Sequence, residues 1–204
     1  MPEPASSRRF RGKTAAERAG ERRARLLAAA LELIGEEGWP AVTMTEICRR
    51  SGLTERYFYE SFTDRDALYV GLIEEVAAET RTAVLDALAT TPDDPRRRMR
   101  AAARALVGVL VADPRKGRIA LIEGLGSATV QARRRELLAA FARLLREEAR
   151  AFYGDAAPRG LRAEVSSIAL VGALGELLGR RIDGSLAISD RRLVDEITEL
   201  ALTL

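Results

Sequence analysis

Three side chains that could bind nucleic acid lie close together near residue 57. Arg56, Tyr57 and Tyr59 carry one guanidinium group and two phenolic hydroxyls, which can donate hydrogen bonds to phosphate oxygens and base edges. The chain of 204 residues has no histidine and a single cysteine. Ser-His and Cys-His relays, histidine-ligated metals and internal disulfides are therefore excluded. We expect binding rather than catalysis, with no cofactor and no metal.

Residues 43–62 contain the elements that would position these side chains. Thr43 and Glu46 predict a capping box at the start of one short helix. Gly52 follows that helix, where a left-handed residue is needed. Thr54 is the predicted cap of a second short helix.

The second short helix is predicted to be amphipathic. Phe58 and Phe62 lie four residues apart and are expected in the core, which leaves Arg56, Tyr57 and Tyr59 to project outward. Two short helices joined by a glycine-containing turn predict a helix-turn-helix, whose second helix enters the major groove of DNA.

The N-terminal segment is strongly basic. Its first 25 residues hold eight basic and three acidic side chains, whereas the whole chain has a net charge of only +3. Residues 1–13 are expected to be disordered, because they contain Pro, Ser and Arg and almost nothing apolar. This basic arm is either a phosphate-seeking segment beside the helix-turn-helix or a solubilising tail.

The remaining chain is expected to be helical throughout. It is rich in Ala, Leu, Arg and Glu, which favour helix, and it has only 7 prolines. Caps and apolar stripes predict about nine helices and no strand. The arginines of the helix predicted over residues 129–153, at positions 133–135, 143 and 146, are expected to face outward. No apolar run reaches the ~18 residues of a membrane span, so we expect a cytoplasmic protein without a membrane partner.

Two single residues have alternative interpretations. Trp39 is expected to pack against the N-terminal helices rather than to stack on a base. Cys48 is expected to be a small buried spacer rather than a reactive thiol.

The region from about Leu26 to Leu72 resembles the TetR family of transcriptional regulators. Its core is Thr43-Met44-Thr45-Glu46-Ile47-Cys48-Arg49-Arg50-Ser51-Gly52-Leu53-Thr54, followed by Phe58-Tyr59-Glu60-Ser61-Phe62-Thr63-Asp64-Arg65-Asp66-Ala67-Leu68. The family usually shows Ile-Ala, Ala-Gly-Val-Ser, Tyr-x-x-Phe and Lys-x-x-Leu at these places. Cys48 and Ser51 replace small alanines, and Arg65 replaces the usual lysine. The resemblance implies an all-α fold with a basic arm over residues 1–13, a three-helix DNA-binding domain over 14–66 and a helical ligand-binding and dimerisation domain over 67–204.

The resemblance also implies roles for individual residues in binding double-stranded DNA. Tyr59 should donate its hydroxyl to a phosphate, as family members do at this position. Thr43, Thr54 and Arg65 are further expected phosphate contacts, since hydroxyls, helix N-termini and arginine suit phosphate. Arg56 and Tyr57 are the expected readers of base edges, with contact to the DNA backbone alone as the alternative.

The C-terminal domain of the family holds an effector pocket and a dimer interface. The residues expected to line the pocket are Leu88, Leu106, Leu110, Ile122, Glu123, Phe141, Leu145 and Leu174. Those expected at the interface are Ile168, Gly172, Gly175, Gly179, Leu193, Ile197, Leu200 and Leu204. The glycine face could instead line the pocket, and Glu123 could bind either a ligand or a neighbouring arginine.

The predicted function is a ligand-responsive repressor that binds a (pseudo)palindromic operator as a homodimer and is released by a small hydrophobic effector. A helical protein-interaction adaptor that kept the motif without binding DNA is the alternative from another class. An enzyme is the weakest reading, because the chain shows no recognisable arrangement of a nucleophile and a base.

Overall fold

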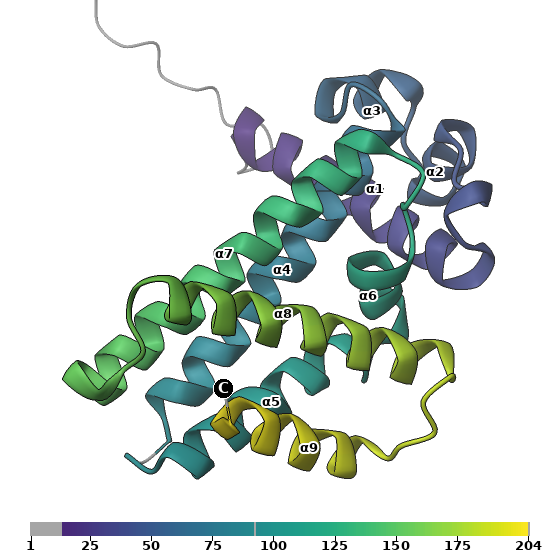
Figure 1. Cartoon of the computed structure of the whole chain (residues 1–204). Helices are drawn as coiled ribbons and strands as arrows, with labels where there is room; N and C mark the ends of the chain where they lie inside the picture. Colours follow the sequence, from purple (N-terminus) through teal and green to yellow (C-terminus); the bar gives the residue numbers. More distant parts are fainter. Residues whose placement is uncertain (1–13, 92, 204) are drawn as a thin grey trace, which may run out of the picture. The chain divides into compact units, whose positions relative to one another are not determined.

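The computed structural model describes residues 14–91 and 93–203, and these residues form helices and loops without a strand (Figure 1). They divide into two compact units, one ending at Gly71 and the other beginning at Leu72. This division lies inside a helix, a few residues after the predicted boundary at 66. The predicted basic arm, 1–13, lies outside the described residues.

The first unit contains three helices and the beginning of a fourth. Their bounds are α1, Ala15–Glu37; a 3₁₀ turn, Trp39–Ala41; α2, Met44–Ser51; α3, Glu55–Ser61; and α4, Arg65–Ala89.

Helix α1 is capped at its start and buried along one face. The Thr14 side chain accepts a hydrogen bond from the Glu17 backbone, and the Glu17 carboxylate accepts one from the Thr14 backbone, which completes a capping box. The apolar face recurs at helical spacing and packs against α2 and α3. Its buried members are Leu26, Leu27, Ala29, Ala30, Leu33 and Ile34.

The turn between α2 and α3 has the predicted backbone geometry. Gly52 lies in the left-handed region, with φ of 63°, where a side chain would be strained. The Arg25 guanidinium of α1 donates to the Ser51 carbonyl over 2.5 Å, at the end of α2 where cations are favourable. On α3, Phe58 and Phe62 are buried as expected, so the core fixes the orientation of the helix.

The caps of the two short helices differ from the prediction. Thr43 accepts from the Glu46 backbone, but the Glu46 carboxylate turns to Arg49 and Arg50 instead of completing a capping box. These two guanidinium groups lower the pKa of Glu46 from its ordinary 4.5 to about 2. Thr54 makes no side-chain cap hydrogen bond with α3. At α2, the two arginines therefore take the carboxylate that the local sequence would assign to the cap.

Trp39 is half-buried and Cys48 is buried in the first unit. The Trp39 ring packs edge-on against buried Tyr69, with centroids 4.5 Å apart, which agrees with packing rather than base stacking. Cys48 is buried, and burial, followed by the charge of Glu55, raises the pKa of its thiol. Cys48 is therefore a spacer and not a reactive site.

The second unit contains the rest of α4 and five further α-helices. Their bounds are α5, Pro95–Leu110; α6, Pro114–Gly117; a π-helical turn η2, Arg118–Ile122; α7, Ala128–Tyr153; a 3₁₀ turn, Gly154–Ala156; α8, Gly160–Asp183; and α9, Asp190–Thr203.

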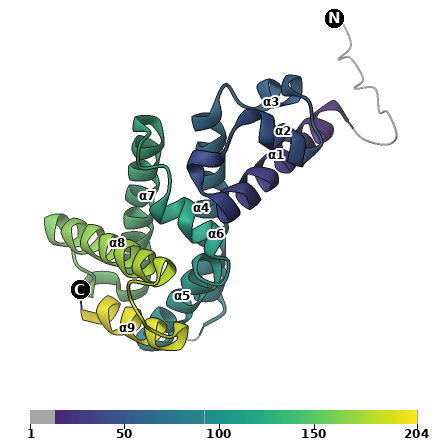
Figure 2. The same ribbon diagram turned by 90° about the vertical axis from the view of Figure 1, so that its right-hand side faces the viewer.

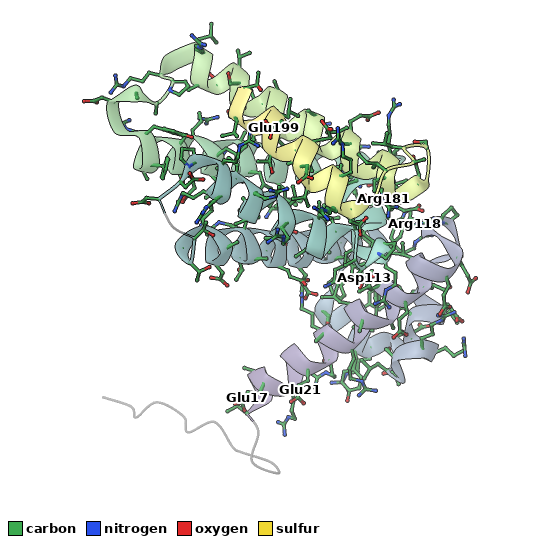
Figure 3. All side chains as sticks on the ribbon, turned by 90° about the horizontal axis from the view of Figure 1, so that it is seen from below. Glu17, Glu21, Asp113, Arg118, Arg181 and Glu199 are labelled. Carbon is green, nitrogen blue, oxygen red and sulfur yellow. The ribbon has the colours of Figure 1, made fainter. Side chains whose placement is uncertain are left out.

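Two helix pairs form the frame of the second unit. Helices α7 and α8 lie side by side (Figure 1), and α5 packs along α9 (Figure 2). Ion pairs join α5 to α9 through Arg100 and Asp195 and through Arg96 and Glu199, the latter labelled in Figure 3. Arg181 near the end of α8 pairs with Asp190 at the start of α9 over 2.8 Å.

The segment after α6 is wound more loosely than an α-helix. The Glu123 backbone donates to the Arg118 carbonyl, five residues earlier, over 2.8 Å. Gly117 directly precedes this turn, and a Cβ added at Gly117 would lie 2.3 Å from the Leu110 carbonyl oxygen. Close packing of Gly117 on α5 and α8 leaves no room for a side chain, and the π-helical turn follows directly after it.

None of the helices described is long and apolar enough to cross a membrane.

Candidate nucleic-acid interface and effector cavity

The start of α3 and the start of α2 present polar side chains to solvent. Thr43, Thr54, Arg56 and Tyr59 are all exposed, Tyr59 by 59%. We call these four residues the recognition face. Tyr59 packs edge-on against buried Phe58, with ring centroids 5.6 Å apart. The core residue thus holds the Tyr59 ring while its hydroxyl stays in water.

Charged residues cross-link the recognition face to α1. Glu60 accepts from Arg56 over 3.0 Å and from Arg22 of α1 over 3.3 Å. The Arg22 guanidinium also lies 4.5 Å above the ring of Tyr57. Tyr57 is therefore half-buried beneath an arginine, whereas Arg56 is open to solvent, so the two expected base readers differ in accessibility.

Arg65 does not project freely as a phosphate contact would. Its guanidinium lies 4.6 Å from the centroid of the Trp39 ring and donates to the Trp39 carbonyl over 3.3 Å. Its Nε is buried without a hydrogen-bond partner. The side chain of Arg65 joins the start of α4 to the 3₁₀ turn, and its expected phosphate contact stays a prediction.

Two arginines without a predicted DNA contact of their own lie beside the recognition face, half-buried Arg22 and exposed Arg49. Arg22 meets α3 as described, and Arg49 of α2 is 68% exposed while pairing with Glu46. Basic residues one or two turns from a predicted helix-turn-helix would have been the signal for both. The DNA-contact roles stay predictions for all six residues, which are Thr43, Thr54, Arg56, Tyr57, Tyr59 and Arg65.

The second unit contains a partly open cavity of about 380 Å³, within the range of small-molecule sites. Helices α4, α5, α7 and α8 contribute most of its wall, which is largely apolar. Six of the residues expected to line an effector pocket do line it: Leu88, Leu106, Leu110, Phe141, Leu145 and Leu174.

Two expected pocket residues lie elsewhere. Ile122 and Glu123 are not among the described residues that line the cavity. The Glu123 carboxylate accepts a hydrogen bond from Arg118 over 2.7 Å. Of the two partners expected for Glu123, a ligand or a neighbouring arginine, the structure contains the arginine. The wide turn η2 rotates both residues away, while Ala120 and Leu121 face the cavity in their place.

Arg134 was expected to face outward on α7 but is buried in the cavity wall. Its side chain is 8% exposed, and its Nη2 donates to the carbonyls of Ile119 and Glu123. Arg146 also lines the cavity and donates to Ser167 over 2.8 Å. The stretch 133–135 gave no signal for this difference, because all three residues are arginine.

Helix α8 exposes a row of apolar side chains on its outer face. Leu161, Val165 and Ile168 are 75%, 56% and 57% exposed, and their spacing of four and three residues places them in one row. A Cβ at Gly172 or at Gly179 would meet no described atom within 4 Å. Gly175 instead lines the cavity, so the glycine face is shared between the outer surface and the cavity.

The expected interface residues of α9 also differ in burial. Leu193 and Ile197 are buried in the core of the second unit, where α9 packs on α5. This corrects their assignment to a dimer interface, because their side chains are occupied within one chain. Leu200 is half-buried, and Leu204 lies outside the described residues.

Comparisons with known proteins agree with the helix-turn-helix. Residues 26–72 match the model of the bacterial regulatory proteins of the tetR family. The HTH-type transcriptional activator FasR of Mycolicibacterium smegmatis is 36% identical over 85 residues, a match that covers 42% of this chain and 38% of FasR. The chain therefore aligns with well under half the length of this curated relative.

Two solved structures share the fold along most of the chain. The fatty acid degradation regulator FadR of Bacillus halodurans has a TM-score of 0.77 at 17% identity, over 89% of this chain and 94% of that one. FadR of Bacillus subtilis, solved in complex with stearoyl-CoA, has a TM-score of 0.73 at 13% identity, over 87% and 96%. The two TM-scores show a common fold, and at these low identities they show the fold alone.

Proposed function

We propose that this chain, which belongs to the TetR family of transcriptional regulators, binds an operator as a homodimer and leaves it when a hydrophobic effector fills the cavity. The observation that carries the proposal is the recognition face. Thr54 at the N-cap of α3 and Arg56 and Tyr59 on the helix are exposed, and the Tyr59 ring packs against the buried ring of Phe58. This is the side of a helix-turn-helix that enters the major groove.

Arg56 and Tyr59 are proposed to have different tasks on DNA. The guanidinium of Arg56 can exchange its exposed pair with Glu60 for the O6 and N7 atoms of guanine. The Tyr59 hydroxyl, with Thr43 and Thr54, would bind phosphates and fix the position of the helix. Specificity would then depend on Arg56, with affinity spread over the whole face.

The exposed row of α8 is proposed as the dimer interface. Leu161, Val165 and Ile168 form an apolar strip, and Gly172 leaves room for a second helix to approach closely. A two-fold dimer would carry two recognition helices and so suit an operator with two half-sites. Ile168→Glu should shift dimer to monomer in sedimentation velocity, whereas Glu164→Gln on the same helix should not.

The apolar cavity is proposed to bind an effector with a long hydrocarbon chain. Its wall is mostly aliphatic and aromatic, and the FadR of Bacillus subtilis shares the fold and binds stearoyl-CoA. Helix α4 begins in the first unit and contributes Val76, Thr80 and Leu88 to the cavity. An effector that prefers one position of α4 would shift the dimer between two states by its differential affinity.

The direction of regulation has two candidates. Release of an operator by an effector gives repression of the neighbouring gene, which we propose here. The name of FasR, an activator, favours the second candidate. A reporter fused to the operator-containing promoter distinguishes them, because deleting the regulator raises expression for a repressor and lowers it for an activator.

Selection of bound duplexes from a random DNA pool tests the DNA-binding function. We expect enrichment of a sequence with two related half-sites, and an affinity that falls steeply as salt rises. Arg56→Ala should relax the preference at one base of each half-site. If no duplex is retained even at low salt, the proposal fails and the protein-interaction adaptor takes its place.

A further inference from the structure

Arg134 occupies an unusual position in the cavity wall. Helix α7 faces the cavity with a stripe at helical spacing that includes Leu137, Leu138, Phe141 and Leu145. Arg134 takes the first place in this stripe, where the pattern calls for another apolar side chain. It is more than nine-tenths buried. A charged side chain at such a place needs a physical reason.

The guanidinium of Arg134 is only partly satisfied within the chain. Its Nη2 donates to the Ile119 carbonyl over 3.1 Å and to the Glu123 carbonyl over 2.5 Å. Its Nε and Nη1 are buried and have no hydrogen-bond partner among residues 14–91 and 93–203. Among the described residues, no carboxylate lies within 4 Å of its nitrogens, since none of the ion pairs includes Arg134.

The other arginines of the cavity have partners and make the contrast clear. Arg146 donates to the Ser167 hydroxyl. Arg98 donates to the Leu88 carbonyl and lies 3.8 Å from the Glu148 carboxylate. Arg134 is therefore the cavity-lining arginine that combines near-complete burial with two unused donors.

An uncompensated buried guanidinium is unfavourable, and it cannot be relieved by losing its proton. Arginine stays protonated in proteins, and burial of a charge without a counter-charge costs free energy. A carboxylate brought into the cavity would supply both a negative charge and hydrogen-bond acceptors.

We propose that the effector is a long-chain carboxylic acid whose carboxylate pairs with Arg134 inside the cavity. This inference rests on the proposed function of the cavity as an effector site. Measured along α7, the wall from Arg134 to Phe152 extends about 27 Å at ~1.5 Å per residue. The stretch past Arg134 is mostly apolar and suits the hydrocarbon chain. A coenzyme A thioester has lost the carboxylate that Arg134 requires.

Binding of the carboxylate would also act on the turn η2. Because Nε and Nη1 are covered by neighbouring atoms, the carboxylate reaches them only when the side chains around Arg134 move. Arg134 holds the carbonyls of Ile119 and Glu123 at the two ends of this turn. The ligand's charge is thereby connected to the segment between α6 and α7.

Calorimetric titration of the full-length protein with three ligands of one chain length tests the proposal. The ligands are palmitate, hexadecanol and palmitoyl-CoA. We expect palmitate to bind roughly 10- to 100-fold more tightly than hexadecanol, as for a hydrogen-bonded charged group. Arg134→Met should remove this preference while hexadecanol binding persists. Arg135→Met, an exposed neighbour on the same helix, should keep it.

The outcomes separate this inference from the proposed function. Equal affinity of the wild type for palmitate and hexadecanol, or a preference that survives in Arg134→Met, overturns the role of Arg134 and leaves the apolar effector standing. Tighter binding of palmitoyl-CoA than of palmitate overturns the buried carboxylate. If neither chain binds while operator binding is intact, the proposed effector class fails as well.

Arg134→Lys guards against a variant that fails to fold. It keeps the charge but not the geometry, and it should retain a reduced preference for palmitate with an unchanged helical circular dichroism spectrum. Complete loss of the preference in this variant, with folding and hexadecanol binding intact, would contradict a role for the charge.

Discussion

Arg56 in the first unit and Arg134 in the second show two different environments for a guanidinium group. Arg56 is exposed and shares the Glu60 carboxylate with Arg22 at the surface, whereas Arg134 is buried in a cavity wall without a carboxylate. An exposed ion pair contributes about 0–1 kcal/mol and exchanges its partner readily. A buried cation is not hydrated, so it needs a counter-charge or a hydrogen-bond acceptor in the protein or in a ligand. The first environment suits a polyanion that arrives from solvent, and the second suits one ligand that is enclosed.

The largest expected effect tests whether the two units keep their sites independently. Phe58→Ala removes a buried ring and should destabilise the first unit by about 3–5 kcal/mol. Operator binding should be lost, while palmitate binding to the second unit persists. Thermal unfolding followed by circular dichroism, together with calorimetric titration, measures both. Tyr59→Phe on the same helix is the control and should leave stability nearly unchanged. Loss of both activities would show that the sites depend on one another.

Salt should separate the two environments. Raising salt from roughly 50 to 200 mM should weaken operator binding by at least about tenfold, because counterions compete for phosphate contacts. Palmitate affinity should change by less than about twofold, since buried charges are screened little. Fluorescence anisotropy with operator DNA and calorimetry with palmitate give the two slopes. Parallel slopes would mean that the ligand's carboxylate stays in solvent.

Substitutions on the recognition face should separate base reading from phosphate binding. Arg56→Ala should cost about 1–3 kcal/mol for the preferred operator and much less for a site altered at one base. Tyr59→Phe should cost about 1 kcal/mol on every sequence, because a phosphate hydrogen bond carries no sequence information. Anisotropy on paired operators measures these values. If Arg56→Ala weakened all sequences equally, its contact would be with the backbone.

The smallest expected effect concerns Glu46, whose pKa falls from 4.5 to about 2 beside Arg49 and Arg50. A lowered pKa in the folded state stabilises the protein above the unfolded value, and this contribution is lost as pH falls from 4.5 towards 2. Glu46→Gln should therefore lower Tm slightly at pH 7, with the difference shrinking in acid. Glu32→Gln on the exposed side of α1 is the control. If the difference in Tm between wild type and Glu46→Gln stayed constant with pH, the charge of Glu46 would not be the cause of the stabilisation.

The features that the sequence predicted correctly depend on neighbours along the chain. The Thr43 cap, the left-handed Gly52 and the buried Phe58 each follow from residues within one or two helical turns. The family resemblance over residues 26–72 was likewise contained in one continuous stretch and is confirmed by the family match.

The features that could not be predicted depend on how distant helices meet. Arg134 stands between two other arginines, and only the packing of α7 on η2 distinguishes it from exposed Arg135. Leu193 forms part of an apolar stripe on α9 that could pack against a partner chain or within the core. In the structure it is buried in the core, because α9 packs on α5. The Arg65 guanidinium stacks on the Trp39 ring, and these two residues are 26 positions apart in the chain.

The burial of Cys48 has a practical consequence for measuring how the dimer responds to operator or effector. It is the only cysteine of the chain, it is enclosed between helices, and its thiol has a raised pKa, so it reacts slowly with thiol reagents. A spectroscopic label can therefore be attached to a cysteine introduced at an exposed position such as Glu32 or Arg135, with Cys48 left in place. Distances between labels in a dimer could then be followed as operator or fatty acid is added.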